Sequence, residues 1–267
     1  MAQFKIKTLL LAAFSIGSLI GYPTVLLAES DGLINKSSPQ FSIRFNSTQR
    51  KPPKRGGNPR TSEGTGSRGD CLYQKDKPQL TRLVGGKNLQ LTVDKYPKLW
   101  FHSSLSREEA PVGEFSLQHG DDEVYQTRFQ LPAKPGVFSI SLPPTAPGLE
   151  VGKKYRFYVE INCPSADNSD DSSTPASLTG VVERVEVSSE LSRDLKAAKT
   201  PLERINVFAK YSIWLNTLTE LAQLRIKQPQ NTNLKNSWIE LLSQPEVGLE
   251  KVSQEPIVET SSLKIEI

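Results

Sequence analysis

The 267-residue chain has few of the residues that most often form catalytic and metal sites. It contains two Cys, two His and one Met. The two histidines, His102 and His119, lack the sequence spacing to each other or to the cysteines that metal ligands have. The G-x-S-x-G motif of serine hydrolases is also absent. We therefore expect no enzymatic activity, no catalytic residues, no cofactor and no metal centre, and interpret both histidines as structural or surface residues.

Long apolar runs are missing after the first 28 residues. Those residues begin with Lys5 and Lys7, continue with an apolar run over residues 9–20 and end at Ala28, which is the layout of a secretory signal peptide. We expect cleavage near Ala28 and export to the periplasm or the extracellular space; an uncleaved N-terminal membrane anchor is the alternative. No later segment is apolar enough to span a bilayer, so no transmembrane span is expected after cleavage.

The chain also lacks a strongly charged region outside its N-terminal part. The formal net charge is +4, but residues 31–70 carry eight Lys or Arg against three acids, whereas residues 71–267 carry 23 against 25. A nucleic-acid interface needs a basic face on a folded domain. We therefore expect no nucleic-acid partner.

Residues 29–70 are rich in Pro, Gly, Ser and basic residues, with one short apolar patch at residues 41–45. Such a composition predicts a flexible basic tether, which could favour anionic polysaccharide or lipid headgroups. It contains a G-x-G-x-x-G match at 64–69 and an Arg-Gly-Asp tripeptide at 68–70. A dinucleotide site needs a strand before the glycines and a helix after them, and neither is predicted here, so we interpret both matches as chance.

The only two cysteines are Cys71, at the start of the predicted folded region, and Cys163, at the end of its most strand-like segment. In an exported protein two cysteines indicate a disulfide bond. Closing so long a loop contributes about 4–5 kcal/mol in the chain-entropy model. Two unpaired thiols are the alternative.

Apolar and polar residues alternate from about Cys71 to Val187, as in "NLQLTV" and "GVFSISLP". This period of two predicts half-buried strands, and Gly, Pro and Asp between the runs predict turns. About eight short antiparallel strands in 71–187 favour a two-layer β-sandwich, Ig-like in style. The expected strands are residues 81–84, 88–93, 98–103, 114–118, 123–131, 136–143, 153–162 and 178–187.

The pattern becomes helical in residues 188–248. Thr200, Pro201 and Glu203 form a capping box, and apolar residues then recur at helical spacing until Pro229. The expected helices are residues 189–198, 201–227 and 233–244, followed by a frayed tail at 249–267. The predicted fold class is therefore α+β, an antiparallel sandwich with a small α-helical C-terminal subdomain docked on it. Trp214 and Trp238 on these helices are either core residues or part of a surface that grips a partner.

Several sequence blocks together resemble a known family. In chain order they include "LTRLVGGKN", "YPKLWFH", "VYQTRFQLPAKPGVFSISLP", "LEVGKKYRFYVEINC" and "ERINVFAKYSIWLNTLTELAQLR". They are similar to the cyanobacterial domain-of-unknown-function 928 family from about Cys71 to about Gly248. The resemblance implies an exported protein of a photosynthetic bacterium and supplies neither an activity nor catalytic residues.

Two acidic clusters are candidate metal sites. "HGDDE", His119 to Glu123, lies between two predicted strands and is better interpreted as a hairpin turn. In the acidic loop 164–175, Asp167, Ser169 and Asp171 match the first positions of a calcium-loop pattern. The glycine at position six and the glutamate at position twelve are missing, so an EF-hand is excluded and only a weak calcium site stays open.

The sequence thus favours an exported, non-enzymatic binding or envelope-interaction protein, with a protein or an envelope polymer as its partner. One alternative is a carbohydrate-active envelope enzyme, in which carboxylates such as Asp121, Glu123 or Glu160 would converge in a cleft about 5–9 Å apart. Another is a carrier with an apolar cavity for a small ligand inside the sandwich.

Overall fold

The computed structural model describes residues 42–46, 80–86, 89–162, 176–258 and 261–262. The chain divides into two units, 1–38 and 39–267, and all described residues belong to the second. The predicted signal peptide, most of the predicted tether, Cys71, Cys163 and the acidic loop with Asp167 and Asp171 lie outside the described residues. In the described part, no helix has both the length and the apolar character needed to cross a membrane.

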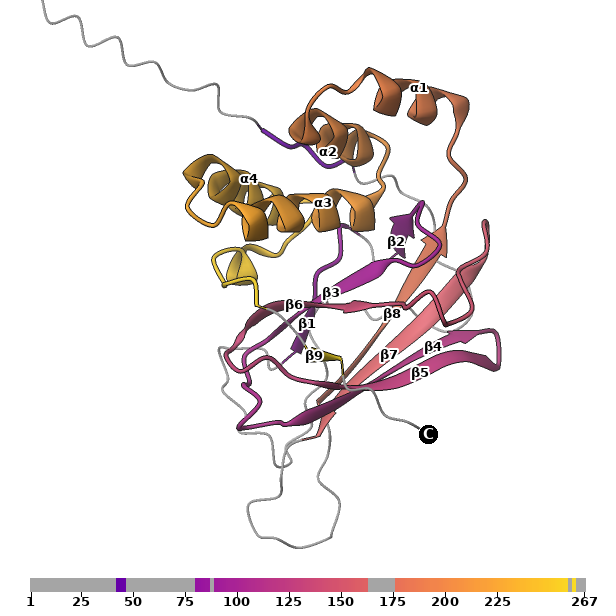
Figure 1. Ribbon diagram of the computed structural model, residues 1–267, viewed down its shortest axis with the longest axis vertical. Coiled ribbons are helices and arrows are strands. Elements are labelled where there is room, and N and C mark those ends of the chain that lie inside the picture. Colours follow the sequence, from indigo (N-terminus) through magenta and orange to yellow (C-terminus); the bar gives the residue numbers. More distant parts are fainter. Residues whose placement is uncertain (1–41, 47–79, 87–88, 163–175, 259–260, 263–267) are drawn as a thin grey trace, which may run out of the picture. The chain divides into compact units, whose positions relative to one another are not determined.

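The second unit is α+β, with two β-sheets and four α-helices among its described residues (Figure 1). Each of the eight expected strands is present, which confirms the period-two pattern. A two-residue strand near the C-terminus was not expected. The strands are β1 (Leu80–Arg82), β2 (Leu89–Thr92), β3 (Lys98–Ser103), β4 (Val112–His119), β5 (Asp122–Gln130), β6 (Gly136–Ser141), β7 (Lys154–Asn162), β8 (Ala176–Arg184) and β9 (Ser261–Ser262).

The strands form a three-stranded sheet, β1-β3-β6, and a six-stranded sheet, β2-β8-β7-β4-β5-β9. All pairs are antiparallel except β2 and β8, which run parallel with Leu89 opposite Val181. The expectation of a wholly antiparallel sheet is therefore wrong at this edge. Alternation along a strand indicates which face is buried but not the direction of its neighbour, so the sequence pattern could not reveal the parallel pair.

Aromatic side chains join the two sheets. The ring of Phe101 in β3 lies 5.8 Å from that of Phe157 in β7, and the ring of Phe138 in β6 lies 5.9 Å from that of Phe129 in β5. Phe157 fits because it covers Gly180 in β8, where an added Cβ would lie 2.3 Å from the ring. The β-rich part thus has two sheets that share an aromatic core, as expected, while its resemblance to an immunoglobulin domain is not confirmed.

The helices are α1 (Ser189–Ala197), α2 (Pro201–Lys210), α3 (Trp214–Lys227) and α4 (Thr232–Leu242), with a 3₁₀ turn, η1 (Glu250–Val252). The capping box at the start of α2 is confirmed: the Thr200 hydroxyl accepts from the Glu203 amide, and the Glu203 carboxylate accepts from the Thr200 amide. The single helix expected over 201–227 is wrong. It is broken at Ser212, which has a left-handed φ of 63°.

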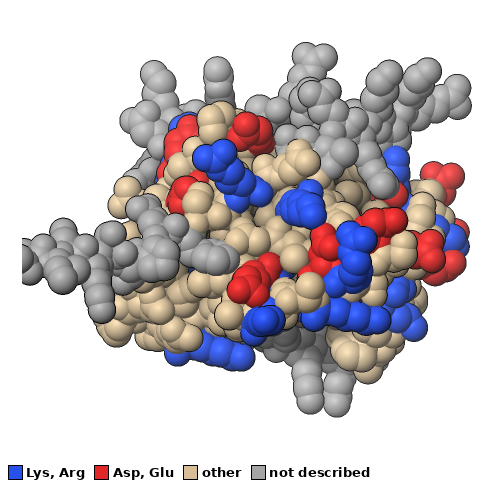
Figure 2. All heavy atoms as spheres, turned by 90° about the horizontal axis from the view of Figure 1, so that it is seen from above, with Lys and Arg blue, Asp and Glu red and all other residues tan. Residues whose placement is uncertain are grey.

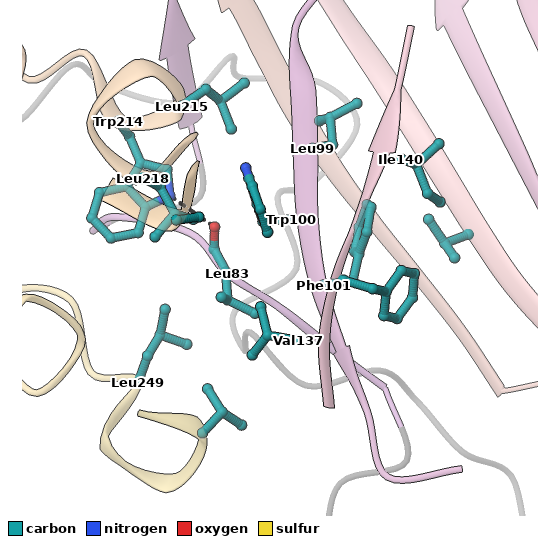
Figure 3. Close-up of a cluster of buried hydrophobic side chains, with 14 of the residues drawn as sticks. Leu83, Leu99, Trp100, Phe101, Val137, Ile140, Trp214, Leu215, Leu218 and Leu249 are labelled. Atoms are coloured by element: carbon teal, nitrogen blue, oxygen red, sulfur yellow. Dashed lines mark hydrogen bonds between the residues drawn. The ribbon is translucent and has the colours of Figure 1, made fainter. Parts of the chain in front are cut away.

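Helices α2, α3 and α4 share a hydrophobic core with the sheets, and Leu191 of α1 lies in a second, smaller cluster with Leu91 of β2. The Trp214 indole nitrogen donates to the Leu83 carbonyl, 2.7 Å away, and the Trp100 indole nitrogen donates to the Thr219 hydroxyl at 2.9 Å. Figure 3 shows Leu83 and Trp100 beside Trp214 and Leu218 of α3. The helical part is therefore docked on the β-rich part, as the sequence predicts.

The predicted frayed tail is ordered over its first part. Leu249 and Val252 are buried in the core, and the Val137 amide in β6 donates to the Pro256 carbonyl at 2.7 Å. The Val258 amide in turn donates to the Val137 carbonyl at 2.8 Å. Residues 249–258 therefore extend the folded region, because their main chain binds a sheet edge that would otherwise lack partners.

Candidate peptide-binding site

A five-residue stretch of the predicted tether packs against the helices. Residues 42–46, hereafter the 42–46 segment, lie beside α2 (indigo in Figure 1). Ile43 and Phe45 are buried, whereas Ser42, Arg44 and Asn46 between and beside them are exposed. Alternating burial is the pattern of an extended chain with one face against a surface. For these five residues the tether prediction needs correction, since two apolar side chains and the main chain find partners on the helices.

Polar groups of the helical part bind the main chain of the segment. The side-chain amide of Gln244, just after α4, accepts a hydrogen bond from the Phe45 amide at 2.9 Å and donates one to the Ile43 carbonyl. The Asn46 amide donates to the Ala209 carbonyl at 3.1 Å, and the Ser212 hydroxyl donates to the Asn46 carbonyl. Four main-chain groups within residues 43–46 thus form hydrogen bonds with the helical part. None of these four bonds uses a side chain of the segment.

One side-chain contact adds to this clasp. The Ser42 hydroxyl donates a hydrogen bond to the carboxylate of Glu240 in α4. The site therefore favours particular side chains at three positions of the segment. It favours a hydroxyl group at position 42 and apolar groups at positions 43 and 45.

The pocket for Phe45 is formed by Trp214 and Gly85. The Phe45 ring meets the Trp214 ring edge-on with centroids 4.8 Å apart, a favoured arrangement for an aromatic pair. A Cβ added at Gly85 would lie 2.2 Å from Trp214 and 2.9 Å from Phe45. Glycine at position 85 is thus what lets both rings occupy this space.

The two tryptophans considered as a partner surface differ in role. Trp214 is 1% exposed and forms the base of the Phe45 pocket. Trp238 is fully buried, and the guanidinium of Arg225 lies 5.1 Å from its ring centre. Both are buried in the structure, and Phe45 of the segment packs against Trp214. A partner surface at these two residues stays a prediction.

The helix break at Ser212 builds half of the site. Ending α2 there leaves the Ala209 carbonyl available to Asn46 and points the Ser212 hydroxyl at the same residue. A left-handed φ at a residue other than glycine is uncommon and is often held in place at functional sites. The sequence pattern missed the break because Phe208 and Leu215 are seven residues apart, a helical spacing that continues across Ser212. The apolar patch at residues 41–45 was the signal in the sequence that part of the predicted tether could pack on the fold.

Charged groups hold the end of α2 next to this break. The Asp194 carboxylate of α1 contacts Lys210 Nζ at 2.8 Å and the Tyr211 hydroxyl at 2.9 Å. The hydrogen bond from Lys210, followed by that from Tyr211, lowers the pKa of Asp194 to about 2. The same hydrogen bond raises the pKa of Lys210. This charged pair fixes α1 against the last turn of α2.

Burial and hydrogen bonds stabilise the bound segment, while the ordering of its backbone opposes them. Burying Ile43 and Phe45 contributes about 1.5–3 kcal/mol each, and four main-chain hydrogen bonds contribute about 0.5–1.5 kcal/mol each. Ordering five backbone residues costs about 1–2 kcal/mol each. Gain and cost are of the same order of magnitude, so the ordering entropy offsets much of what the contacts contribute.

The histidine and hairpin predictions can be placed in the structure. Gly120, with φ of +65°, and Asp121 form the two-residue turn between β4 and β5, which confirms the hairpin expected at "HGDDE". The His119 ring nitrogen Nδ1 lies 3.0 Å from the Lys154 carbonyl, and its ring packs 5.1 Å from that of Tyr155. His102 is buried in β3. Within the described residues no group of three or more His, Cys, Asp or Glu could hold a metal ion.

The carboxylates of the enzyme alternative do not come together. Glu123 of β5 pairs with Gln118 of β4, which pairs with Arg156 of β7. Glu160 lies four residues further along β7, so it is about 13 Å from that row at the usual strand rise. Asp121 is exposed at the hairpin tip. Glu123 and Glu160 are therefore too far apart for the 5–9 Å pair of a glycosidase.

Charge is mixed on the face seen in Figure 2. Lys and Arg alternate there with Asp and Glu, and neither sign gathers into one large patch. This distribution agrees with the near-neutral balance of residues 71–267 in the sequence. On this face the structure offers no broad electrostatic footprint for a polyanion.

A family model matches most of the chain. The family model described as Domain of Unknown Function (DUF928) matches residues 63–257, well over half of the chain. The match includes strands β1 to β8 and all four helices but not the 42–46 segment. The resemblance in the sequence blocks is thereby confirmed, while cyanobacterial origin and export stay predictions. No curated protein matches the chain.

Proposed function

The chain belongs to the DUF928 family, and from this premise we propose that it is an exported, non-enzymatic binding protein whose helical part holds an extended segment of polypeptide. One observation carries the proposal: the site already holds such a segment, by four main-chain hydrogen bonds and two buried apolar side chains. Main-chain groups are common to all peptides, so alternate side-chain pockets would supply the specificity.

The β-rich part serves in this proposal as the scaffold, a sandwich that we take to be Ig-like in style. It supports the site directly, because the Leu83 carbonyl holds the Trp214 indole beneath Phe45. Export rests on the signal-peptide pattern of residues 1–28. A protein of the periplasm or cell surface would meet its partner there, and a protein chain fits the site better than an envelope polymer does.

The test uses a full-length variant in which the two buried side chains of the 42–46 segment are replaced by serine, so that they no longer fill the site. A random peptide library is displayed to an Ile43→Ser/Phe45→Ser variant, and bound sequences are counted. We expect enrichment of peptides with an apolar and an aromatic residue two positions apart. Adding Gln244→Ala should abolish the enrichment, since it removes two of the four main-chain hydrogen bonds that hold the segment. A folded double variant that enriches nothing over background would refute the proposal.

Deleting the helices would not be a usable test. Trp100 of β3 and Trp214 of α3 belong to one core, so removing the helices would also damage the sheets. The point changes alter two side chains of that core, Ile43 and Phe45, and keep all of its other members. The carbohydrate-active alternative gains nothing from its three candidate carboxylates, whose positions do not converge.

A further inference from the structure

We propose that the 42–46 segment is an exchangeable occupant of the site, which a partner chain displaces with a segment of the pattern aliphatic-any-aromatic. This inference rests on the proposed function and adds to it the chemistry of the ligand and the competition that regulates access. It follows from three features of the structure: the chemistry of the contacts, the separate origin of the occupant, and the length of the chain that connects it to the fold.

The contacts define the ligand. Ile43 and Phe45 are buried while Arg44 between them is exposed, so the middle position tolerates any side chain. The edge-on contact with Trp214 and the space left by Gly85 favour an aromatic ring at the second pocket. The amides of Phe45 and Asn46 both donate hydrogen bonds. Proline is therefore excluded at the aromatic position and at the one after it.

The occupant comes from outside the family domain. The residues that build the site, such as Ala209, Ser212 and Gln244, lie within the family match of 63–257, whereas the 42–46 segment lies before it. A site inside the shared domain thus holds a segment that is not part of that domain. Ile43 and Phe45 pack in the same hydrophobic core as Trp214, so the segment from outside the match completes a core that residues of the match build.

The 42–46 segment can leave the site and still remain attached to the protein through residues 47–79. Residues 47–79 link the segment to β1, which begins at Leu80. For the flexible connection that the sequence predicts, a released segment stays near the site at an effective concentration on the order of millimolar. The apparent affinity of a partner segment is its intrinsic affinity multiplied by the fraction of sites that are open. The partner segment must therefore have a high intrinsic affinity or a high concentration.

The experiment compares binding in trans with the segment present and absent in cis. A fluorescent peptide of residues 39–49, "PQFSIRFNSTQ", is titrated into full-length wild type, Ile43→Ser/Phe45→Ser and the matched control Arg44→Ser. We expect the double variant to bind at least about tenfold more tightly than wild type, because its own segment no longer competes. Arg44→Ser should behave as wild type, and a peptide carrying Phe45→Ser should not bind.

A second experiment uses a chain that keeps every native contact of the segment. It gives a result even if the double variant does not fold. A protease site placed within residues 47–79 of the otherwise wild-type chain is cut after folding. Exchange of the cut segment for the fluorescent peptide supports the inference. Equal binding to wild type and the double variant would overturn the competition while leaving the proposed function intact. No exchange after cutting, with no binding to the folded double variant, would overturn the inference even if the library test selects other peptides.

Discussion

At the scale of single residues, a few polar side chains place the segment and the helices that hold it. Gln244 binds the Ile43 carbonyl and the Phe45 amide of the segment, and Ser212 binds the Asn46 carbonyl. Gln and Ser are common on helix surfaces, so neither residue type indicates in a sequence that its side chain binds the main chain of another segment. The role depends on the backbone turn at each position, which only the folded chain supplies.

Asp194 gives a pH-dependent prediction at this scale. Its pKa is lowered from 3.8 to about 2 by Lys210 and Tyr211, so its contribution to stability is present above the unfolded-state pKa. That contribution is lost as the pH falls through about 2. We expect Asp194→Asn to lower the melting temperature at pH 6, and the difference from wild type to shrink between pH 4 and pH 2.

Thermal unfolding followed by circular dichroism across this pH range is the measurement. Asp121→Asn, at the exposed hairpin tip, is the matched control and should show no such convergence. A difference between wild type and Asp194→Asn that stays constant down to pH 2 would mean that the ion pair does not hold α1 to α2.

At the scale of elements, alternation and capping were strong predictors. The strand positions and the start of α2 follow from residues whose neighbours in sequence are also their neighbours in space, as with Thr200 and Glu203. The parallel pair β2–β8 and the break at Ser212 depend on contacts with distant residues, such as Val181 and Asn46. The local sequence pattern does not encode such long-range contacts. The part of the site that depends on the break at Ser212 could therefore not be predicted from the sequence.

The junction between α3 and β2 depends on one buried amide. The Asn216 side-chain oxygen accepts from the Val93 amide at 3.1 Å and from the Thr92 hydroxyl at 3.2 Å, and its nitrogen donates to the Asp94 carboxylate at 3.0 Å. Asn216→Ala would leave a partly buried amide without its acceptor. We expect a loss of about 1–3 kcal/mol in the free energy of unfolding.

Urea denaturation of wild type, Asn216→Ala and Asn233→Ala measures this loss. Asn233 lies exposed on α4 and is the matched control, for which little change is expected. Equal stability of all three proteins would show that the contact between α3 and β2 does not depend on this side chain.

At the scale of the whole molecule, the disulfide between Cys71 and Cys163 stays a prediction, since both residues lie outside the described part. If export is right, the mature protein should be lighter than its reduced form by two hydrogens in intact-mass measurement. Removing both cysteines should lower stability by about 4–5 kcal/mol in the chain-entropy model. Full alkylation of both thiols without a reductant would contradict the pairing.

The helices and the sheets should also unfold as one body. Trp100 donates to Thr219 of α3, Trp214 donates to Leu83 near β1, and residues 249–258 bind the edge of β6. A chain that ends at residue 187 would expose this shared core and lose the partners of the β6 edge. We therefore expect it to aggregate or to unfold without a cooperative transition, whereas a chain that lacks only residues 1–28 keeps one sharp transition. A truncated chain with a cooperative transition of its own would instead establish two independent domains, and the site would then lie between separable parts.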